Sequence, residues 1–272
     1  MSRSFIKETN NLMIVDAFNL AFRYKDTEKP FVEDYIKTIS SLGRSYNASR
    51  IILAADKGVS SYRYEIFPEY KANRTEKYAE QTEEEANKFK KFLQEYRNAL
   101  TEASNKWELL RFDNTEADDI AAYIVSKEEL ENRYKHIWLI SSDKDWDLLV
   151  SDFVSRFSFV TRKETTLNNW MDHYDFDKEY LLSFKCLNGD PGDNINGVDG
   201  VGKARANQLF QVFGKIDSLL DSLPLPSSPS YYKSINASRD TLYHNLQLID
   251  LVSFCKDALG DNTETIDKLL EI

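Results

Sequence analysis

Short apolar runs alternate with stretches of helical spacing through the first two-thirds of the chain. The apolar runs, which have the length and composition of strands, occupy residues 12–16, 50–56, 107–112, 136–140 and 154–160. Between them, apolar residues recur three or four positions apart at residues 31–46, 82–104 and 115–131. Strands that alternate with helices predict an α/β fold with a mostly parallel central sheet flanked by helices.

The strand pattern stops near residue 177. Helical spacing continues at residues 178–187, 203–213, 215–223 and 232–251, and a loop rich in proline and serine interrupts it at 223–230. We therefore expect two parts. An α/β core would occupy residues 1–176, and a helical region that packs on the core would occupy residues 177–272.

The composition fits a soluble protein with a substantial core, because 42% of its 272 residues are hydrophobic and 13% are aromatic. No apolar run reaches membrane-spanning length, and residues 1–10 lack the apolar stretch of a secretion signal. We therefore expect a cytoplasmic protein with no membrane partner. The two cysteines, Cys186 and Cys255, have no zinc-binding spacing and are interpreted as reduced thiols.

The net charge of −10 argues at first against a nucleic-acid partner, because it repels phosphate. Nine of the 45 acidic residues, however, fall in the motifs described below, and the remaining acids nearly balance the 35 basic residues. The excess acidity therefore belongs almost entirely to one candidate site, whose local field bound cations would partly reverse. Without these motifs, an ordinary acidic protein would be the interpretation.

Three of the apolar runs end in aspartate. Asp16 ends the first run, Asp56 ends the second, and Asp143 and Asp145 follow the run at 136–140. Ligands bind beyond the carboxyl ends of the strands in an open α/β sheet, so parallel neighbours would bring these four carboxylates to one edge. Each aspartate alone is better explained as a helix cap or turn residue, but three strands with the same ending are harder to explain by capping.

A second acidic motif begins the predicted helix after Thr115. It contains Glu116, Asp118 and Asp119. Thr115 and Asp118 fit a capping box, and acids in a first helical turn complement the helix dipole. Capping does not require three acids in four positions, however, and carboxylates this close repel one another unless they are protonated or share a cation.

The turn at residues 189–194 contributes Asp190 and Asp193, which flank a Pro-Gly pair; alone it is a common acidic turn. All nine acidic candidates offer hard oxygen ligands, and such sites favour Mg²⁺ or Mn²⁺ over zinc. Two such cations about 4 Å apart are the usual machinery for in-line attack on a phosphodiester. The acidic residues therefore predict a site for two divalent cations.

A glycine-rich loop that ends at Gly202 and Lys203 nearly matches the phosphate-binding loop of nucleotide hydrolases. Ala204, however, stands where that loop needs the serine or threonine that binds Mg²⁺. We favour a helix-hairpin-helix, in which Gly200 and Gly202 form a tight turn while Lys203 and Arg205 begin the next helix. Such a module holds the duplex backbone without reading its sequence. A plain turn between two helices is the simpler alternative.

The segment at residues 62–78 fits neither the strand nor the helix pattern. It mixes aromatic residues with Arg63, Lys71, Arg74 and Lys77. Such interleaving suits a single strand of nucleic acid, because cations meet phosphates and rings stack on bases. Taken alone, the segment is explained as well or better by a solvated loop that leads into the following helix.

Taken together and in this order, the motifs resemble the 5′ nucleases. The matching segments are IVDAFN, AADKG, EYKANR, TEADD, SSDKDWD and GDPGDNINGVDGVGKARA. The resemblance covers roughly residues 12–251. It is strongest to the stand-alone phage flap endonucleases, and the chain is also similar to the 5′ nuclease domain of bacterial DNA polymerase I. It implies a PIN-like core, an arch at about residues 62–104 over the active site, and a C-terminal helix-hairpin-helix region.

The resemblance also implies roles for individual residues. The positions that match ligands of a first metal are Glu116, Asp118 and Asp143. Those that match acids of a second metal are Asp145, Asp190 and Asp193. Acids that share or support the pair match Asp16, Asp56 and Asp119. Cationic positions near the cut phosphate match Lys71, Arg74, Arg23 and Lys185. Tyr70 matches an aromatic residue that stacks on a displaced base, and the hairpin at 197–202 matches a duplex-binding module that holds a monovalent cation such as K⁺.

The predicted function is hydrolysis of DNA phosphodiesters at junctions of single and double strands, by two divalent cations, leaving 5′-phosphate and 3′-hydroxyl ends. The partner would be branched or 5′-ended DNA, and the enzyme a monomer of replication or repair. Two alternatives stay open. An RNA-directed PIN-like nuclease would be shorter and would lack the hairpin, and a non-catalytic protein that binds branched DNA would not need all nine acids.

Overall fold

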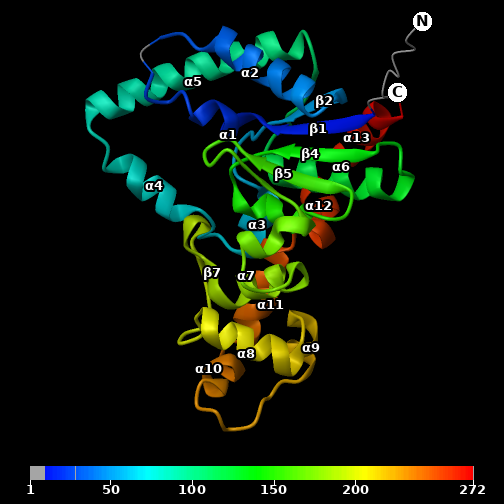
Figure 1. The fold of residues 1–272 in the computed structure, drawn as a ribbon. Helices are drawn as coiled ribbons and strands as arrows, with labels where there is room; N and C mark the ends of the chain where they lie inside the picture. The colour runs from blue at the N-terminus through cyan, green and yellow to red at the C-terminus, as the bar shows by residue number, and fades with distance from the viewer. Residues whose placement is uncertain (1–9, 28, 272) are drawn as a thin grey trace, which may run out of the picture.

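The computed structural model describes residues 10–27 and 29–271 (Figure 1). The strands are β1 (Asn11–Asp16), β2 (Ala48–Ala54), β3 (Glu108–Leu110), β4 (His136–Ile140), β5 (Val154–Ser158), β6 (Lys163–Thr165), β7 (Gly189–Asp190) and β8 (Ile195–Asn196). The α-helices are α1 (Ala17–Phe22), α2 (Val32–Ser45), α3 (Ser61–Ile66), α4 (Ala72–Ala79), α5 (Glu83–Ser104), α6 (Ala117–Glu131), α7 (Leu181–Asn188), α8 (Lys203–Phe213), α9 (Ile216–Asp221), α10 (Tyr232–Ala237), α11 (Arg239–Ile249), α12 (Leu251–Leu259) and α13 (Asn262–Leu270). Short 3₁₀ helices are η1 (Lys144–Leu149), η2 (Leu167–Asp172), η3 (Lys178–Tyr180) and η4 (Pro191–Asp193).

The central sheet has the strand order β3-β2-β1-β4-β5-β6, and only the edge strand β6 runs antiparallel. The predicted fold class is therefore confirmed. The chain passes from β1 to one side of the sheet and later returns to β4 on the other side. This reversal lies beside the carboxyl end of β1, which is where open α/β sheets bind their ligands.

Helices cover both faces of the sheet (Figure 1). Leu12 and Ile14 of β1 pack into a core shared with α6 and α12, while Met13 and Val15 pack into a core shared with α2 and α5. All four side chains are buried, as expected of a central parallel strand that is covered on both sides. Because β1 is packed on both faces, the position of its carboxyl end is fixed.

The segment at residues 62–78 folds into two helices that sequence periodicity did not predict. Helix α3 ends at Ile66, because Phe67 takes an extended conformation before Pro68. Helix α4 then leads away from the body of the molecule to the start of α5 (Figure 1). A capping box between Thr82 and Glu85 fixes the start of α5. The arrangement forms the arch that the family resemblance implies.

The helical region differs from its predicted pattern in two ways. The single pattern at 232–251 is two helices, α10 and α11, with the break at Ser238. Two more helices follow, and Asp250 begins the first by accepting hydrogen bonds from the backbone of Val252 and Ser253. That helix, α12, packs against α6 of the core. In the described part of the chain, no helix is both long and apolar enough to cross a membrane.

Candidate active site

The carboxyl ends of β1 and β4 are joined through Asp16. One carboxylate oxygen of Asp16 accepts from the backbone N–H of Asn19, 3.0 Å away, and so caps α1. The other accepts from the Ser141 hydroxyl at 2.8 Å, and the same hydroxyl oxygen accepts from the N–H of Asp143 at 3.1 Å. Capping is therefore part of the role of Asp16, and it also fixes the strand ends beside each other.

The N-terminus of α6 docks on the end of β2 through Asp56. A carboxylate oxygen of Asp56 accepts from the backbone N–H of Ala117 at 2.7 Å. This contact brings Glu116 and Asp118 to the same edge of the sheet. The indole N–H of Trp146, which follows β4, donates to Asp118 at 2.6 Å. Acids after β1, β2 and β4 and at the start of α6 thus lie together, as the sequence predicts.

Two side chains of the arch reach Glu116. The Nζ of Lys71 lies 2.7 Å from one of its carboxylate oxygens, and the Tyr70 hydroxyl donates to the other at 2.9 Å. The Tyr70 hydroxyl also lies 3.0 Å from Asp193, and the guanidinium of Arg74 donates to Asp193 at 2.6 Å. The arch is therefore tied to both the first turn of α6 and the acidic turn at η4.

Lys185 links the remaining acids. Its Nζ lies 2.5 Å from Asp145 and 3.4 Å from Asp190. Asp190 also accepts from the backbone N–H of Gly192, which closes the turn. Gly189 makes the approach possible, because its φ is +71° and an added Cβ would lie 2.3 Å from the carbonyl oxygen of Ile195.

Asp119 points to a different neighbour. Both of its oxygens accept from the Arg63 guanidinium, at 2.7 and 2.8 Å, and the pair is buried. Because both of its oxygens accept from Arg63, Asp119 holds this guanidinium in place and is not turned toward the other acids. The expectation that Asp119 is a supporting acid fits this position, but direct ligation does not.

The electrostatics of the cluster show where positive charge is lacking. Burial raises the pKa of Asp16 well above its usual value, and Asp56 adds to the rise. Burial likewise raises the pKa of Asp118 well above its usual value, and Asp143 and Asp56 reinforce it. Glu116 differs: burial favours a higher pKa, but Lys71 and Arg63 hold it below the ordinary value. Around Asp16, Asp56 and Asp118, burial and mutual repulsion therefore outweigh the stabilisation that hydrogen bonds and nearby cations give to the charged carboxylates.

This donor set fits divalent cations. The ligands are all carboxylate oxygens, and their mutual repulsion is what bound cations would relieve. In residues 10–27 and 29–271, no three acidic, histidine or cysteine side chains close around one point as tightly as a bound ion requires. Instead, Lys71, Arg74 and Lys185 contact the acids directly. Cation binding would therefore require these three side chains to release some of their carboxylate partners.

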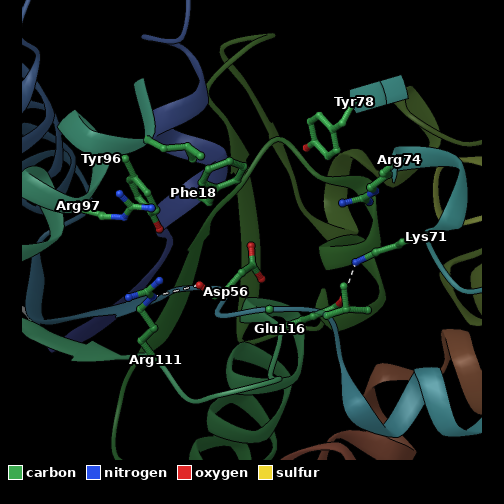
Figure 2. Close-up of a pocket in the computed structure, with 12 residues that line it drawn as sticks. Phe18, Asp56, Lys71, Arg74, Tyr78, Tyr96, Arg97, Arg111 and Glu116 are labelled. Carbon is green, nitrogen blue, oxygen red and sulfur yellow. Dashed lines mark hydrogen bonds and ion pairs between the residues drawn. The ribbon is translucent and has the colours of Figure 1, made fainter. Parts of the chain in front are cut away.

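Two predicted site residues differ from expectation or lie away from this network. Tyr70 is 5% exposed, so its buried ring is not available to stack on a base, and that expectation does not fit its position. Tyr78, which is 52% exposed, borders a cavity beside the carboxylates in Figure 2 and is an aromatic residue open to solvent there. Arg23 is exposed and lies over the rings of Tyr24 and Phe159.

The predicted hairpin residues lie between β8 and the first turn of α8. Gly200 has a φ of +72°, and Gly202 precedes the first helical residue. Lys203 pairs with Asp175, with 3.1 Å between Nζ and a carboxylate oxygen. Arg205 donates to the carbonyl oxygen of Gly200 and so closes the turn. The exposed N-terminus of α8 thus presents backbone N–H groups and two basic side chains to solvent.

Two family models match this chain in sequence. The model of the N-terminal resolvase-like domain of 5′-3′ exonucleases matches residues 11–180, and the model of their C-terminal SAM fold matches residues 176–263. The chain belongs to the 5′-3′ exonuclease family. The two matches meet near residue 177, where the strand pattern of the sequence stops.

Relatives of this 5′-3′ exonuclease include the flap endonuclease of Escherichia phage T5, which is 44% identical over 253 residues covering 92% of this chain and 86% of the relative. DNA polymerase I of Bacillus subtilis is 24% identical over 90% of this chain but only 28% of its own length. A crystal structure of the T5 protein co-crystallised with metal ions matches with a TM-score of 0.90, at 43% identity, over 96% of this chain and 98% of that one. A pseudo-enzyme-product complex of T5 flap endonuclease with DNA and metal ions also has a TM-score of 0.90, at 42% identity, over 96% and 100% of the two chains.

Sequence reasoning missed several residues of this 5′-3′ exonuclease that support the site. Ser141 and Trp146 donate to Asp16 and Asp118, and nothing in their spacing sets them apart. Arg111 could have been found, because it follows β3 directly and the carboxyl ends of the strands were already the expected location. The sequence indicates Arg63 only as a basic residue of a mixed segment, whereas the structure buries it.

Loss of Arg63 should destabilise the protein strongly. We expect Arg63→Ala to lower the free energy of unfolding by about 3–5 kcal/mol, because it leaves Asp119 buried without its partner. Chemical denaturation measures this change. The matched control is Lys37→Ala, which removes an exposed pair with Glu33 and should cost less than about 0.5 kcal/mol. Equal effects of the two substitutions would contradict the role assigned to Arg63.

Stability without divalent cations should depend on pH through the acids. Burial raises the pKa of Asp145 to about 6, although Lys185 opposes this rise. Since the folded pKa exceeds the ordinary value of 3.8, the stabilising contribution is complete below that value and is lost as pH rises through about 6. We expect thermal unfolding in a chelator to show falling stability across this interval, and Asp145→Asn to flatten the slope. A slope unchanged in the variant would contradict this assignment.

Proposed function

We propose that this chain is a structure-specific 5′ nuclease, acting as flap endonuclease and 5′-to-3′ exonuclease, which hydrolyses DNA phosphodiesters where single and double strands meet. The products would carry 5′-phosphate and 3′-hydroxyl ends. The observation that carries the proposal is the gathering of acidic side chains from five separate segments at the carboxyl edge of one parallel sheet. The relative named as flap endonuclease and the two family models of 5′-3′ exonucleases support it.

The acids would hold two divalent cations, Mg²⁺ or Mn²⁺. One group of candidate ligands is Glu116, Asp118 and Asp143. The second group is Asp145, Asp190 and Asp193. Asp16 and Asp56 would support both groups by raising the local negative potential, and Asp119 would act through Arg63. When bound, two such cations supply Lewis-acid stabilisation of the charge that develops on a phosphodiester during in-line attack.

The basic residues of the arch would bind the scissile phosphate. Lys71 and Arg74 already lie at the edge of the cluster, bonded to Glu116 and Asp193. If cations take over these carboxylates, both side chains become available to a phosphate, and Arg74 can contact it through two N–H groups. Lys185 and Arg23 would add positive charge on the other sides. Lys71 and Arg74 would thus position the substrate, and its phosphate would replace the carboxylates as their partner.

The hairpin at the start of α8 would bind the duplex part of the substrate. Its exposed helix N-terminus and the basic residues Lys203 and Arg205 suit a phosphate backbone, which carries no sequence information. The loop at 197–202 would also hold a monovalent cation such as K⁺ against that backbone. On this proposal the chain acts as a monomer on branched or 5′-ended DNA in the cytoplasm, during replication or repair.

Cleavage of an end-labelled 5′-flap DNA tests the proposal. In Mg²⁺ we expect a main product cut near the junction, together with short exonuclease products, and we expect none of them in chelator. An equivalent flap made of RNA is the comparison that separates DNA from RNA preference. Binding of the flap without any cleavage in Mg²⁺ or Mn²⁺ would support a non-catalytic protein instead, and faster cleavage of the RNA would support the RNA-directed alternative.

Reversal of charge at the hairpin should weaken duplex binding without regard to sequence. We expect Lys203→Glu to lower affinity by a similar factor, about tenfold at low salt, for DNA duplexes of unrelated sequence, and to reduce the salt dependence of binding. The matched control is Lys215→Glu, a similarly exposed lysine that precedes α9 and pairs with Glu179. Equal losses in the two variants would show only a general effect of charge.

A further inference from the structure

A cavity of about 350 Å³ adjoins the carboxylate cluster at Asp56 (Figure 2). Lys71, Arg74 and Tyr78 border one side of it. The opposite side is formed by Tyr96 and Arg97 of α5 and by Arg111, which follows β3. Figure 2 shows both guanidinium groups and the Tyr96 hydroxyl gathered on this side, facing the Asp56 carboxylate. None of these three residues contacts the carboxylate groups of the acidic cluster through a hydrogen bond or ion pair among the described residues.

The two arginines keep most of their charge and hydrogen-bonding capacity free. Arg111 donates through Nε to the backbone carbonyl of Asp56 at 3.2 Å, which leaves its terminal nitrogens available. Arg97 makes a long contact of 3.5 Å with Gln94. Among the residues that the structure describes, neither arginine forms an ion pair with a carboxylate. The arginines therefore differ from Lys71 and Arg74 across the cavity, which are bonded to acids.

Tyr96 provides an independent sign of a missing ligand. Its side chain is 5% exposed, and its hydroxyl finds no hydrogen-bond partner among the described residues. A buried polar group without a partner costs about 1–3 kcal/mol, so it is seldom kept without a use. Burial raises the pKa of Tyr96 well above its usual value, so the hydroxyl keeps its proton and can donate it. The acceptor that it lacks is an anion or another oxygen-rich group.

We propose that Tyr96, Arg97 and Arg111 bind a second phosphate of the substrate strand, separate from the phosphate that is cut. Two guanidinium groups offer only donors and a protonated phenol offers one more, which suits the oxygens of a phosphate. Because this site and the acids share Asp56 at their border, a strand whose scissile phosphate lies at the acids would bring a neighbouring phosphate here. The proposal rests on the function proposed above and adds a contact that would set the position of the cut.

The test uses the full-length protein and 5′-flap DNA in which one phosphate at a time is replaced by a neutral methylphosphonate. In wild-type protein we expect about tenfold slower cleavage when the neutral linkage occupies one position beside the cut, as expected for the loss of a charge-assisted contact. Arg97→Gln and Arg111→Gln should each slow cleavage of normal DNA by about tenfold and abolish the sensitivity at that position. The control is Lys91→Gln, an exposed residue of the same helix outside the cavity.

A second arm separates the two possible sources of the phosphate. Substrates with a 5′-phosphate and a 5′-hydroxyl end are compared at each flap length. If the two substrates differ in cleavage rate and this difference disappears in Arg111→Gln, the bound group is a terminal phosphate. If methylphosphonate slows cleavage at one internal position, the bound group is an internal phosphodiester. Tyr96→Phe should slow cleavage while leaving the melting temperature unchanged or raised, because it removes an unpartnered buried hydroxyl.

The outcomes distinguish this proposal from the proposed function. Absence of metal-dependent cleavage by the wild-type protein would contradict the proposed nuclease function. If the wild-type protein cleaves but both arginine variants behave as Lys91→Gln, with the methylphosphonate pattern unchanged, the second phosphate site is wrong. Loss of stability in Tyr96→Phe without any change in cleavage would likewise assign Tyr96 to the core alone.

Discussion

Asp145→Asn should reduce the rate of DNA cleavage by about a thousandfold, the scale expected when one electrostatic contributor to the transition state is removed. The substitution keeps the shape of the side chain but removes a charge that would hold a divalent cation. Folding should be preserved, because burial already disfavours the charged form of Asp145. Single-turnover cleavage of a 5′-flap DNA in saturating Mg²⁺ measures the change, and the melting temperature in chelator checks the fold.

The control for this prediction is Asp172→Asn, which removes an exposed carboxylate at the end of η2. It should leave cleavage within about twofold of wild type, as expected for a surface change away from the site. DNA binding in Ca²⁺ should persist in both variants, because the hairpin contacts would remain. Cleavage by Asp145→Asn at the wild-type rate would contradict the assignment of Asp145 to the catalytic centre.

Lys71→Ala should slow cleavage by about a hundredfold while leaving duplex affinity nearly unchanged, since a preorganised donor at the reacting group typically contributes this much. The Nζ of Lys71 lies 2.7 Å from Glu116 and 3.7 Å from Asp193, at the edge of the acids and away from the hairpin. The rate and the affinity should therefore respond separately. Single-turnover rates and duplex dissociation constants, measured at one ionic strength, give the two quantities.

Lys57→Ala is the matched control, because Lys57 is partly exposed and pairs with Asp113 after β3. It should affect neither quantity by more than about twofold. Equal losses of rate and affinity in Lys71→Ala would reduce Lys71 to an ordinary phosphate contact. The pKa of Glu116 should also rise in this variant, because burial would no longer be opposed by its nearest cation. Its pH-rate profile should therefore shift upward.

Much of the fold followed from local patterns. The runs before Asp16 and Asp56 are buried on both faces, and such runs predict parallel strands whose ends meet at one edge. The position of the acids followed from the same rule. The helices α3 and α4 did not, because short helices with mixed polar and aromatic residues lack the periodic apolar face that marks a longer helix. Tertiary contacts at Tyr70 and Lys71 fix that segment, and no short-range pattern records them.

The partner of each charged residue was also beyond sequence reasoning. Asp119 and Asp118 are neighbours in one motif, yet Asp119 is bound by Arg63 and Asp118 by the indole of Trp146. The helical turn sends the two side chains in different directions, and residues from distant segments meet them there. Tyr70 was expected at a base for the same reason: its place in the sequence is right for the arch, but its hydroxyl turns inward to Glu116.

The most direct measurement of the central claim is anomalous diffraction from crystals of the protein with Mn²⁺ and a 5′-flap DNA. We expect two strong peaks at the carboxyl edge of the sheet. The first should be bound by carboxylates from the group Glu116, Asp118 and Asp143. The second should be bound by carboxylates from the group Asp145, Asp190 and Asp193. Peaks elsewhere, or DNA cut in the crystal with Lys71 and Lys185 still bonded to these acids and no metal between them, would contradict the account.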